Sequence, residues 1–395
     1  MSWFKQAAAV TAMNLRSIRE RSGTSLVAIV GIAGVVAVLI GIFSIAAGFR
    51  AVLEQSGADD VAIVLRGGST DEMTSGFSQQ QTRIIADAPG VLQDGGNPVA
   101  SSELYVLVDV PLKSTGTPAN VPLRGVGAQA AQLRNGFRII DGREFRPGTN
   151  EVIVGRGAAQ QFAGLDVGAE LKSGNQAWNV VGIFADTGSV AESEIWSDAV
   201  VLQGAYNRGT SYQSTRVRLE SPNALTTFKD ALTSDPRVNV SVRTEREYYA
   251  AQSRSLVTLV TYVGGTIAIL MGLAAVFGAL NTMYSAVSAR TREIATLRAI
   301  GFGALPVVTS VLAEAMLLGA IGGTIGALIA YFGFNGIRAS TMNWSSFSQI
   351  TFAFVVTPTL VVQSLIYALV LGFVGGLMPS LRAARMPITA GLRDS

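Results

Sequence analysis

The sequence contains no cysteine and no histidine. Without cysteine, no disulfide framework can hold a domain together, so any folded domain must rely on its own hydrophobic core. Without histidine, the chain lacks the usual general base near neutral pH, the His-containing zinc sites and every His-based catalytic triad. Any hydrolytic chemistry would have to be built from carboxylates, Lys, Ser or Tyr. We expect a non-catalytic chain with no metal site.

A nucleotide-binding loop is also missing. No Gly-Lys dipeptide occurs anywhere in the chain, so the phosphate-binding motif GxxxxGK[ST] is absent. If ATP drives this protein, another chain must bind it. Charged residues make up only 14% of the sequence and the net charge is +3, with no concentrated basic patch outside the flanks of the apolar runs, which argues against nucleic acid as a partner.

Long apolar runs are abundant, in keeping with a hydrophobic content of 49%. A hydrocarbon core of about 30 Å needs about 20 apolar residues in a helix, and four runs are that long. The predicted spans cover residues 25–49, 255–287, 305–334 and 352–378. The first could instead be a cleavable secretory signal, but its apolar core is too long, so an uncleaved anchor is expected. The predicted fold class is an α-helical membrane protein with four transmembrane helices and a large external α+β domain between the first and second.

Lysine and arginine gather at three flanks of these spans. They are Lys5, Arg16, Arg19 and Arg21; then Arg290, Arg292 and Arg298; then Arg382, Arg385 and Arg393. The positive-inside rule places all three flanks, and so both termini, in the cytoplasm. The predicted cytoplasmic segments are 1–24, 288–304 and 379–395, and the external ones are 50–254 and 335–351. The first of these segments is predicted to form an amphipathic helix in the inner headgroup layer, with a solvated basic tail as the alternative.

The external segment 50–254 is polar and rich in turn signals. Short β-rich runs alternate with helical candidates, which predicts a mixed α+β domain of two lobes, one built by its flanks and one by its middle. Both ends are predicted to be helices that continue out of the membrane. Its acidic groups, Asp59-Asp60, Asp71-Glu72 and Glu192 with Glu194, are interpreted as solvated surface and not as a catalytic dyad or a calcium site.

A run of about twenty residues carries a family resemblance. The stretch LNTMYSAVSARTREIATLRAIGFG, starting at Leu280, resembles the FtsX/MacB family of ABC permeases, whose second span ends in Asn-x-Met and passes into a cytoplasmic helix. The matching positions are Asn281, Met283, Arg290, Glu293, Ile294, Leu297, Arg298, Ala299 and Gly301. Similar stretches are 142–171 and WNVVGIF at 178–184, which look like the periplasmic core domain of MacB-like permeases, and the tail 379–393. Ala295 and Gly391 depart from the family's common Gly and Ala.

The resemblance implies a permease subunit in the bacterial inner membrane, with its large domain in the periplasm. It also implies a coupling helix that docks in a groove of a separate ATPase subunit, two copies of which would bind ATP and Mg. In this coupling helix, the charges fix orientation, the apolar residues fill the groove and Gly301 ends the helix; the residues are Arg290, Arg292, Glu293, Ile294, Leu297, Arg298 and Gly301. From the residues alone, a basic segment resting on anionic lipid is an equal alternative.

Two features inside the spans carry further expectations. Glu314 is the one acid within a predicted span; it is expected to face a protein interior near a polar partner such as Asn281, or else to reach the headgroups. Small residues at helical spacing predict close helix packing, within one subunit or between two. They are Gly319, Gly322, Gly323 and Gly326 in the third span, with Gly372 and Gly376 in the fourth.

The predicted function is coupling of ATP hydrolysis in the partner to a conformational change of the periplasmic domain, for export or extraction of a substrate. The expected partners are the ATPase, a second permease subunit, identical or related, membrane lipids and, for some cargoes, a periplasmic adaptor and an outer-membrane channel. Drug or peptide export, lipoprotein or lipid extraction and control of a cell-wall hydrolase all remain open. The alternative from another class is a membrane-anchored sensor that signals through its external domain without transport.

Overall fold

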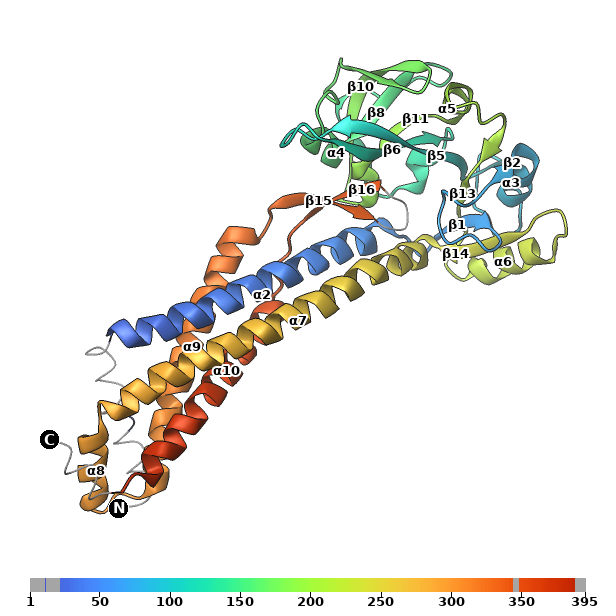
Figure 1. Cartoon of the computed structure of the whole chain (residues 1–395). Helices are drawn as coiled ribbons and strands as arrows, with labels where there is room; N and C mark the ends of the chain where they lie inside the picture. The colour runs from blue at the N-terminus through green and yellow to red at the C-terminus, as the bar shows by residue number, and fades with distance from the viewer. Residues whose placement is uncertain (1–10, 12–21, 344–347, 388–395) are drawn as a thin grey trace. The chain divides into compact units, whose positions relative to one another are not determined.

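The computed structural model describes residue 11, residues 22–343 and residues 348–387. The amphipathic helix expected over 1–24 and the last part of the tail therefore fall mostly outside the described residues. Four of the described helices are long and apolar enough to cross a membrane, as the sequence predicted. They are α2 (Ser22–Ser56), α7 (Glu245–Ser288), α9 (Ala304–Phe334) and α10 (Pro358–Arg385) (Figure 1).

The chain divides into two compact units. The membrane unit holds the described residues up to Ala47 together with 259–337 and those from Phe354 onward, and the external unit holds 48–258 and 338–353. The helices α2 and α7 each contribute residues to both units, so the predicted helical extensions of the first two spans are present. Counted along the chain, the backbone passes between the units four times.

The segment between the third and fourth spans differs from the prediction. It was expected to be a loop over 335–351, with the span starting at Phe352, but the structure has a hairpin of β15 (Arg338–Asn343) and β16 (Ser348–Ala353). Residues such as Ile350 and Phe352 favour a pleated strand. The helix α10 starts only at Pro358, where proline suits the first helical position and the Thr357 hydroxyl accepts a hydrogen bond from the Leu360 N–H at 3.2 Å.

A ten-stranded mixed sheet forms the frame of the external unit, which is α+β as predicted. Its strand order is β14-β1-β13-β5-β6-β11-β8-β10-β7, with β9 on β10; β8 pairs with β10, and β6 with β11, in parallel. The strands are β1 (Val61–Arg66), β5 (Ala100–Pro111), β6 (Pro118–Val126), β7 (Phe137–Gly142), β8 (Glu151–Gly155), β9 (Glu170–Ser173), β10 (Gln176–Asp186), β11 (Ile195–Asp198), β13 (Ser214–Arg218) and β14 (Val240–Thr244). The smaller elements are β2 (Phe77–Ser78), β3 (Gln93–Asp94), β4 (Asn97–Pro98), β12 (Ser211–Tyr212), α3 (Gln79–Ala86), α4 (Arg156–Gln161), α5 (Ala199–Ala205), α6 (Ala224–Ser234), η2 (Ala130–Leu133) and η3 (Val190–Ser193).

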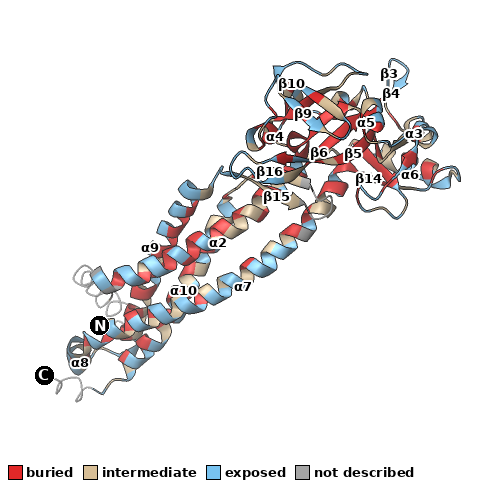
Figure 2. Cartoon of the chain, turned by 45° about the horizontal axis from the view of Figure 1, so that its top comes forward, coloured by how far each residue is buried: buried red, intermediate tan, exposed pale blue. Residues whose placement is uncertain are grey.

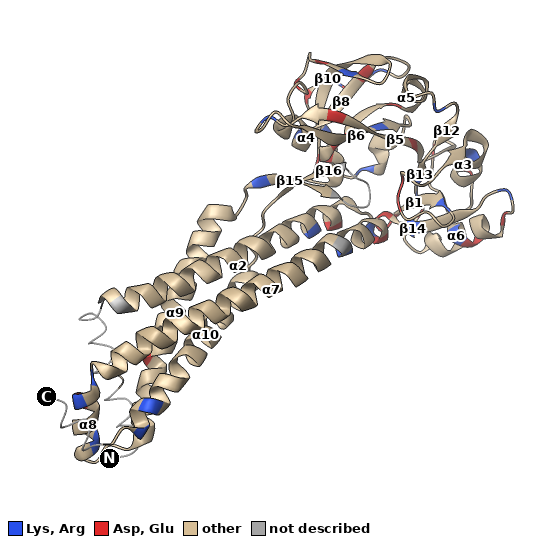
Figure 3. Cartoon of the chain, viewed as in Figure 1, with Lys and Arg blue, Asp and Glu red and all other residues tan. Residues whose placement is uncertain are grey.

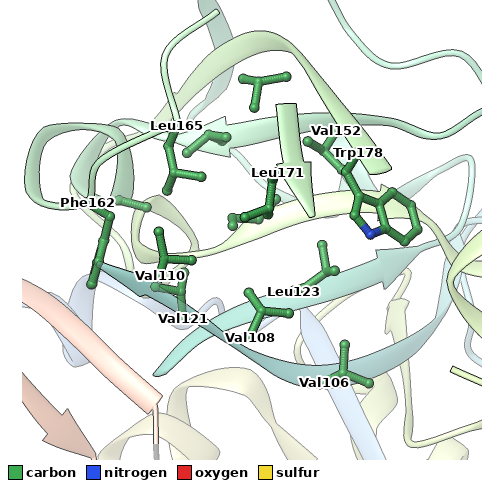
Figure 4. Close-up of a cluster of buried hydrophobic side chains, with 14 of the residues drawn as sticks. Val106, Val108, Val110, Val121, Leu123, Val152, Phe162, Leu165, Leu171 and Trp178 are labelled. Atoms are coloured by element: carbon green, nitrogen blue, oxygen red, sulfur yellow. The ribbon is translucent and has the colours of Figure 1, made fainter. Parts of the chain in front are cut away.

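Two of the hydrophobic cores on this sheet lie over the middle and over the flanks of the external segment. The middle of the segment builds one, in which α4 and α5 cover strands β5, β6, β8 and β10 around the fully buried Trp178 (Figure 4). The flanks build the other, where α3 and α6 pack on β1, β13 and β14 through Ile85 and Phe228. Alternating apolar residues on the strands produce both cores, because successive side chains point to opposite faces of a sheet.

The helix α9 packs closely against two neighbours in the membrane unit. Buried residues follow it along its length, whereas α7 is mostly exposed (Figure 2). A Cβ atom added at Gly319 or Gly372 would lie 2.8 or 2.7 Å from a carbonyl oxygen of the other helix of the α9/α10 pair, and one added at Gly326 would lie 2.4 Å from the Ala33 oxygen of α2. The remaining glycines of the predicted stripe lie at the same contacts: Gly323 and Gly376 between α9 and α10, and Gly322 against α2. These contacts are within one chain.

We expect Gly326→Ala to lower the stability of the membrane unit by about 1–3 kcal/mol, because the new methyl group forces α9 away from α2. Gly333→Ala is the matched control on the same helix, since a Cβ atom there meets nothing within 4 Å. Thermal unfolding in detergent, followed by circular dichroism, measures both variants. Equal melting temperatures for the two would contradict the close approach of α9 and α2.

Candidate functional site

A short helix, α8 (Thr291–Ala299), occupies the centre of the predicted coupling segment 288–304. It begins just after α7 and ends at Gly301, whose φ of 99° is the left-handed conformation that glycine adopts most readily. The N–H of Phe302 donates to the Leu297 carbonyl at 3.1 Å across this turn, which satisfies one of the last free carbonyls. The predicted glycine cap is confirmed.

The inner face of α8 packs against its own chain. Ile294 is buried in a core with Met283 and Val287 of α7 and Val307 and Val311 of α9, and Leu297 is half-buried. The sequence had assigned Ile294 and Leu297 to the groove of a partner. For Ile294 that assignment is wrong. Burial of its apolar side chain in the adjacent core of the same chain is favourable, whereas exposure to water is not.

The start of α8 is held by a buried ion pair. A guanidinium nitrogen of Arg290, Nη1, donates to Glu314 Oε2 at 3.0 Å, and both side chains are 5% exposed. The predicted interior position of Glu314 is therefore correct, but Asn281 is exposed and is not its partner, and the headgroup alternative is excluded by burial. A buried carboxylate needs a cation beside it, and the turn between α7 and α8 brings one.

The end of α8 is held by a second arginine. Arg298 Nη1 donates to the main-chain oxygens of Ala384 and Met386, at 2.8 and 2.9 Å. These carbonyls lie at the end of α10, where a helix leaves its last acceptors unsatisfied and favours positive charge. Arg298 was expected to orient a partner. In the structure it instead connects the end of α8 to the end of α10 within the same chain.

The outer face of α8 remains exposed. It presents Arg292, Glu293 and Thr296. Within the described part of the membrane unit, arginines gather at α8 and at the neighbouring end of α10, while the long helices carry few charges elsewhere (Figure 3). The helix therefore has one face bound to α7 and α9, both ends fixed by arginines, and a polar face available to another molecule.

A cluster of buried charges lies in the external unit and was missed in the sequence. Arg124 of β6 makes two hydrogen bonds each to Glu72 and Glu194 at 2.7–3.0 Å, and one to Glu103 at 2.8 Å. Arg216 of β13 also contacts Glu72 and Glu103. The interpretation of Glu72 and Glu194 as solvated surface is wrong, and so is that of Glu192, whose carboxylate pairs with Arg156.

The electrostatics of this cluster follow from burial and close pairing. Burial by itself raises the pKa of Glu72, but Arg124 and Arg216 together hold that pKa well below its usual range. The pKa of Arg124 is raised, since its three carboxylates outweigh the cost of burial. Burial also raises the pKa of the nearby Tyr249 to about 12. Glu72 and Arg124 are therefore both charged near neutral pH.

The cluster reaches the first residue of α7. Glu245 accepts a hydrogen bond from Arg216 Nε at 3.2 Å and pairs with Arg134. A carboxylate at a helix N-terminus also interacts favourably with the helix dipole. The start of α7 is thus attached by charge to the sheet of the external unit.

Family models match most of the chain. The model of the MacB-like periplasmic core domain matches residues 25–235, and that of the FtsX-like permease C-terminal region matches 265–388. The chain is an ABC transporter permease of the MacB/FtsX family. The resemblance found in the sequence is confirmed, and the permease is a membrane protein with an external domain.

Several known proteins are similar to this permease. The macrolide export ATP-binding/permease protein MacB of Burkholderia lata is 25% identical over 94% of this chain and 54% of its own length. The uncharacterized ABC transporter permease YvrN of Bacillus subtilis is 32% identical over 29% of this chain and 26% of its own. The periplasmic region of MacB from Actinobacillus actinomycetemcomitans aligns with 49% of this chain and 92% of that structure at 13% identity and a TM-score of 0.38. The permease spans about half the length of the MacB relatives it matches.

The hairpin of β15 and β16 belongs to the external unit of the permease. The N–H of Thr351 donates to the Ser193 hydroxyl at 2.9 Å, and the ring of Phe352 meets that of Phe49 edge-on with centroids 5.8 Å apart. Arg338 also contacts Gln160 of α4. The chain between α9 and α10 is therefore docked on the external unit, a contact that the prediction of a loop did not include.

Proposed function

We propose that this permease transmits ATP-driven motion from a cytoplasmic ATPase, docked on α8, to its external unit. The external unit then engages a substrate for export or for extraction from the membrane. The proposal places the permease in the bacterial inner membrane, as the family resemblance implies. Both termini are then in the cytoplasm, because Lys and Arg gather in three sequence flanks of the spans.

The observation that carries the proposal is the fixing of α8 at both ends. Arg290 connects its start to α9, and Arg298 connects its end to α10. A force on the exposed face with Arg292 and Glu293 would therefore move these helices, because buried, hydrogen-bonded contacts do not slip as a flexible linker does. A segment that rested only on lipid would need neither connection.

The chain offers four covalent routes from the membrane unit to the external unit. Two are the helices α2 and α7, and two are the strands of the hairpin between α9 and α10. On the external side, Glu245 attaches α7 to the buried charge cluster, and Thr351 attaches the hairpin to η3. These attachments support transmission of motion into the sheet.

The proposed partners follow from the family. The name of the MacB relatives joins ATP-binding and permease functions in one protein. For this chain we propose a separate ATPase subunit in two copies, which would bind ATP and Mg, and a second permease subunit. A periplasmic adaptor and an outer-membrane channel would be needed only for export across a second membrane.

Exchange of the charges on the exposed face tests the proposal. The double variant Arg292→Glu/Glu293→Arg keeps the net charge and leaves Arg290 and Arg298 intact. We expect about tenfold less ATPase activity to copurify with it in mild detergent. Each exchanged charge on α8 would then lie opposite a charge of the same sign on the ATPase and repel it. The measurement is ATP hydrolysis by the affinity-purified complex, with identification of every associated chain.

Glu170→Lys/Lys172→Glu is the matched control, since it exchanges an exposed pair on β9 of the external unit. It should leave the copurified ATPase activity unchanged. Undiminished activity in the α8 variant would overturn docking on this face. Failure of the wild-type permease to recruit any ATPase would favour a sensor that signals without transport.

A further inference from the structure

The edge strand β14 leaves one side of the external sheet open. It pairs with β1 alone, from Ala62 opposite Thr244 to Arg66 opposite Val240. It lies at the rim of the sheet beside α6 (Figure 1). Exposed strand edges present unpaired main-chain N–H and C=O groups, and proteins normally protect them or use them for pairing.

Two hydrogen bonds show which residues point outward. The N–H of Gly67, at the end of β1, donates to the Asn239 carbonyl at 2.9 Å, so Asn239 faces β1. The N–H of Thr244 instead donates to the Glu247 carboxylate at 3.2 Å. Facing alternates along an antiparallel ladder, so the main-chain groups of Val240 and Val242 point to the open side. Within the part of the chain that the structure describes, no strand pairs with them there.

A groove with a volume of 990 Å³ follows this edge, between the side chains of α6 and the first turns of α7. Three cations line it: Lys229, Arg243 and Arg254. None of the three forms an ion pair with any described residue. The one acid of the lining, Glu247, is engaged by the Thr244 N–H. The groove is therefore positively charged along an open row of hydrogen-bonding groups.

We propose that β14 and its groove bind an extended acidic segment of a partner protein, which adds to the sheet as an eleventh strand. Main-chain hydrogen bonds to Val240 and Val242 hold the segment, and its carboxylates face Lys229, Arg243 and Arg254. A second copy of this chain fits less well, because pairing of the same edge brings like charges together. Anionic lipid headgroups would use the cations but leave the main-chain groups unpaired.

The test uses the full chain in nonionic detergent and a fluorescent peptide, Glu-Val-Glu-Val-Glu-Val. We expect saturable binding by fluorescence anisotropy, and none for the corresponding Lys-Val peptide. Arg243→Glu/Arg254→Glu should weaken binding by about tenfold or more, whereas Arg208→Glu, at an exposed arginine outside the groove, should not. Equal binding to the groove variant and to the Arg208 variant would overturn the proposal.

Two N-methylated peptides separate strand addition from simple charge attraction. One is methylated at the three valine amides and the other at the three glutamate amides, so each loses the N–H groups of one edge. Only one of the two should lose binding, because only one edge of an added strand faces β14. Equal binding of both would overturn strand addition.

Two further experiments test whether a lipid surface or a second copy of the chain occupies the groove instead. Displacement of the peptide by phosphatidylglycerol vesicles, but not by phosphatidylcholine vesicles, would assign the groove to a lipid surface. Because the chain has no cysteine, Ser241→Cys introduces a single thiol on β14. A rapid disulfide between two chains would assign the edge to a second copy. Either result would overturn the proposal without bearing on the ATPase docking at α8.

Discussion

Replacing Arg124 with methionine is expected to destabilise the external unit by about 3–5 kcal/mol, the usual cost of removing one partner from a buried ion network. Methionine keeps much of the volume but none of the charge. Glu72, Glu103 and Glu194 then share a buried site in which Arg216 is the remaining cation that contacts two of them, Glu72 and Glu103. Urea unfolding of the full chain in detergent, followed by tryptophan fluorescence, measures the loss; Trp196 donates to Glu194 and reports from the cluster itself.

Arg143→Met is the matched control. Arg143 also makes two short hydrogen bonds to one carboxylate, that of Glu151, but it is 46% exposed. Water can replace the lost partner there, so a much smaller effect is expected. Similar losses in the two variants would show that burial does not set the contribution of the Arg124 cluster.

Replacing Arg290 with methionine is expected to destabilise the membrane unit by about 3 kcal/mol, because Glu314 then loses its contact with a cation in a buried position. The same change frees the start of α8 from α9. We therefore also expect ATP hydrolysis by the purified complex to respond less to substrate. Thermal unfolding in detergent and ATP turnover measure the two effects.

The double variant Arg290→Met/Glu314→Gln separates the two effects. It removes both charges, so much of the lost stability should return, whereas coupling through the ion pair should not. If the double variant is as unstable as Arg290→Met alone, the cost does not come from the loss of the Arg290 contact at the Glu314 carboxylate. If coupling returns together with stability, the ion pair does not transmit motion.

Local patterns in the sequence were sufficient to predict the four spans and some of the strands. Each span needs only a long apolar run, and some strands of the external unit, such as β8, need only a short run of β-branched residues. The hairpin was missed because its strand at Ser348–Ala353 adjoins the apolar start of α10, and hydropathy alone does not separate the two. Only the main-chain pairing with Arg338–Asn343 does so.

Local sequence patterns did not predict the contacts between residues that are distant in the chain. Arg124 and Glu72 are 52 positions apart, and Arg290 and Glu314 are 24 apart. In the sequence each is an ordinary charge beside polar or apolar neighbours. An arginine within the strand PANVPLRGV was the available signal for the external cluster, since a charge on an otherwise buried strand requires a buried partner.

The family, the four spans and the position of α8 could all be predicted from the sequence, because each depends on composition and spacing along a short stretch. Which side chains are buried together became visible only in the folded chain. In the folded chain, Ile294 lies in the chain's own core and Glu314 pairs with Arg290. Glu72, which was predicted to be solvated, belongs to a buried ion network. The physical reason is that the free energy of a charge depends on its surroundings, which folding assembles from distant parts of the chain.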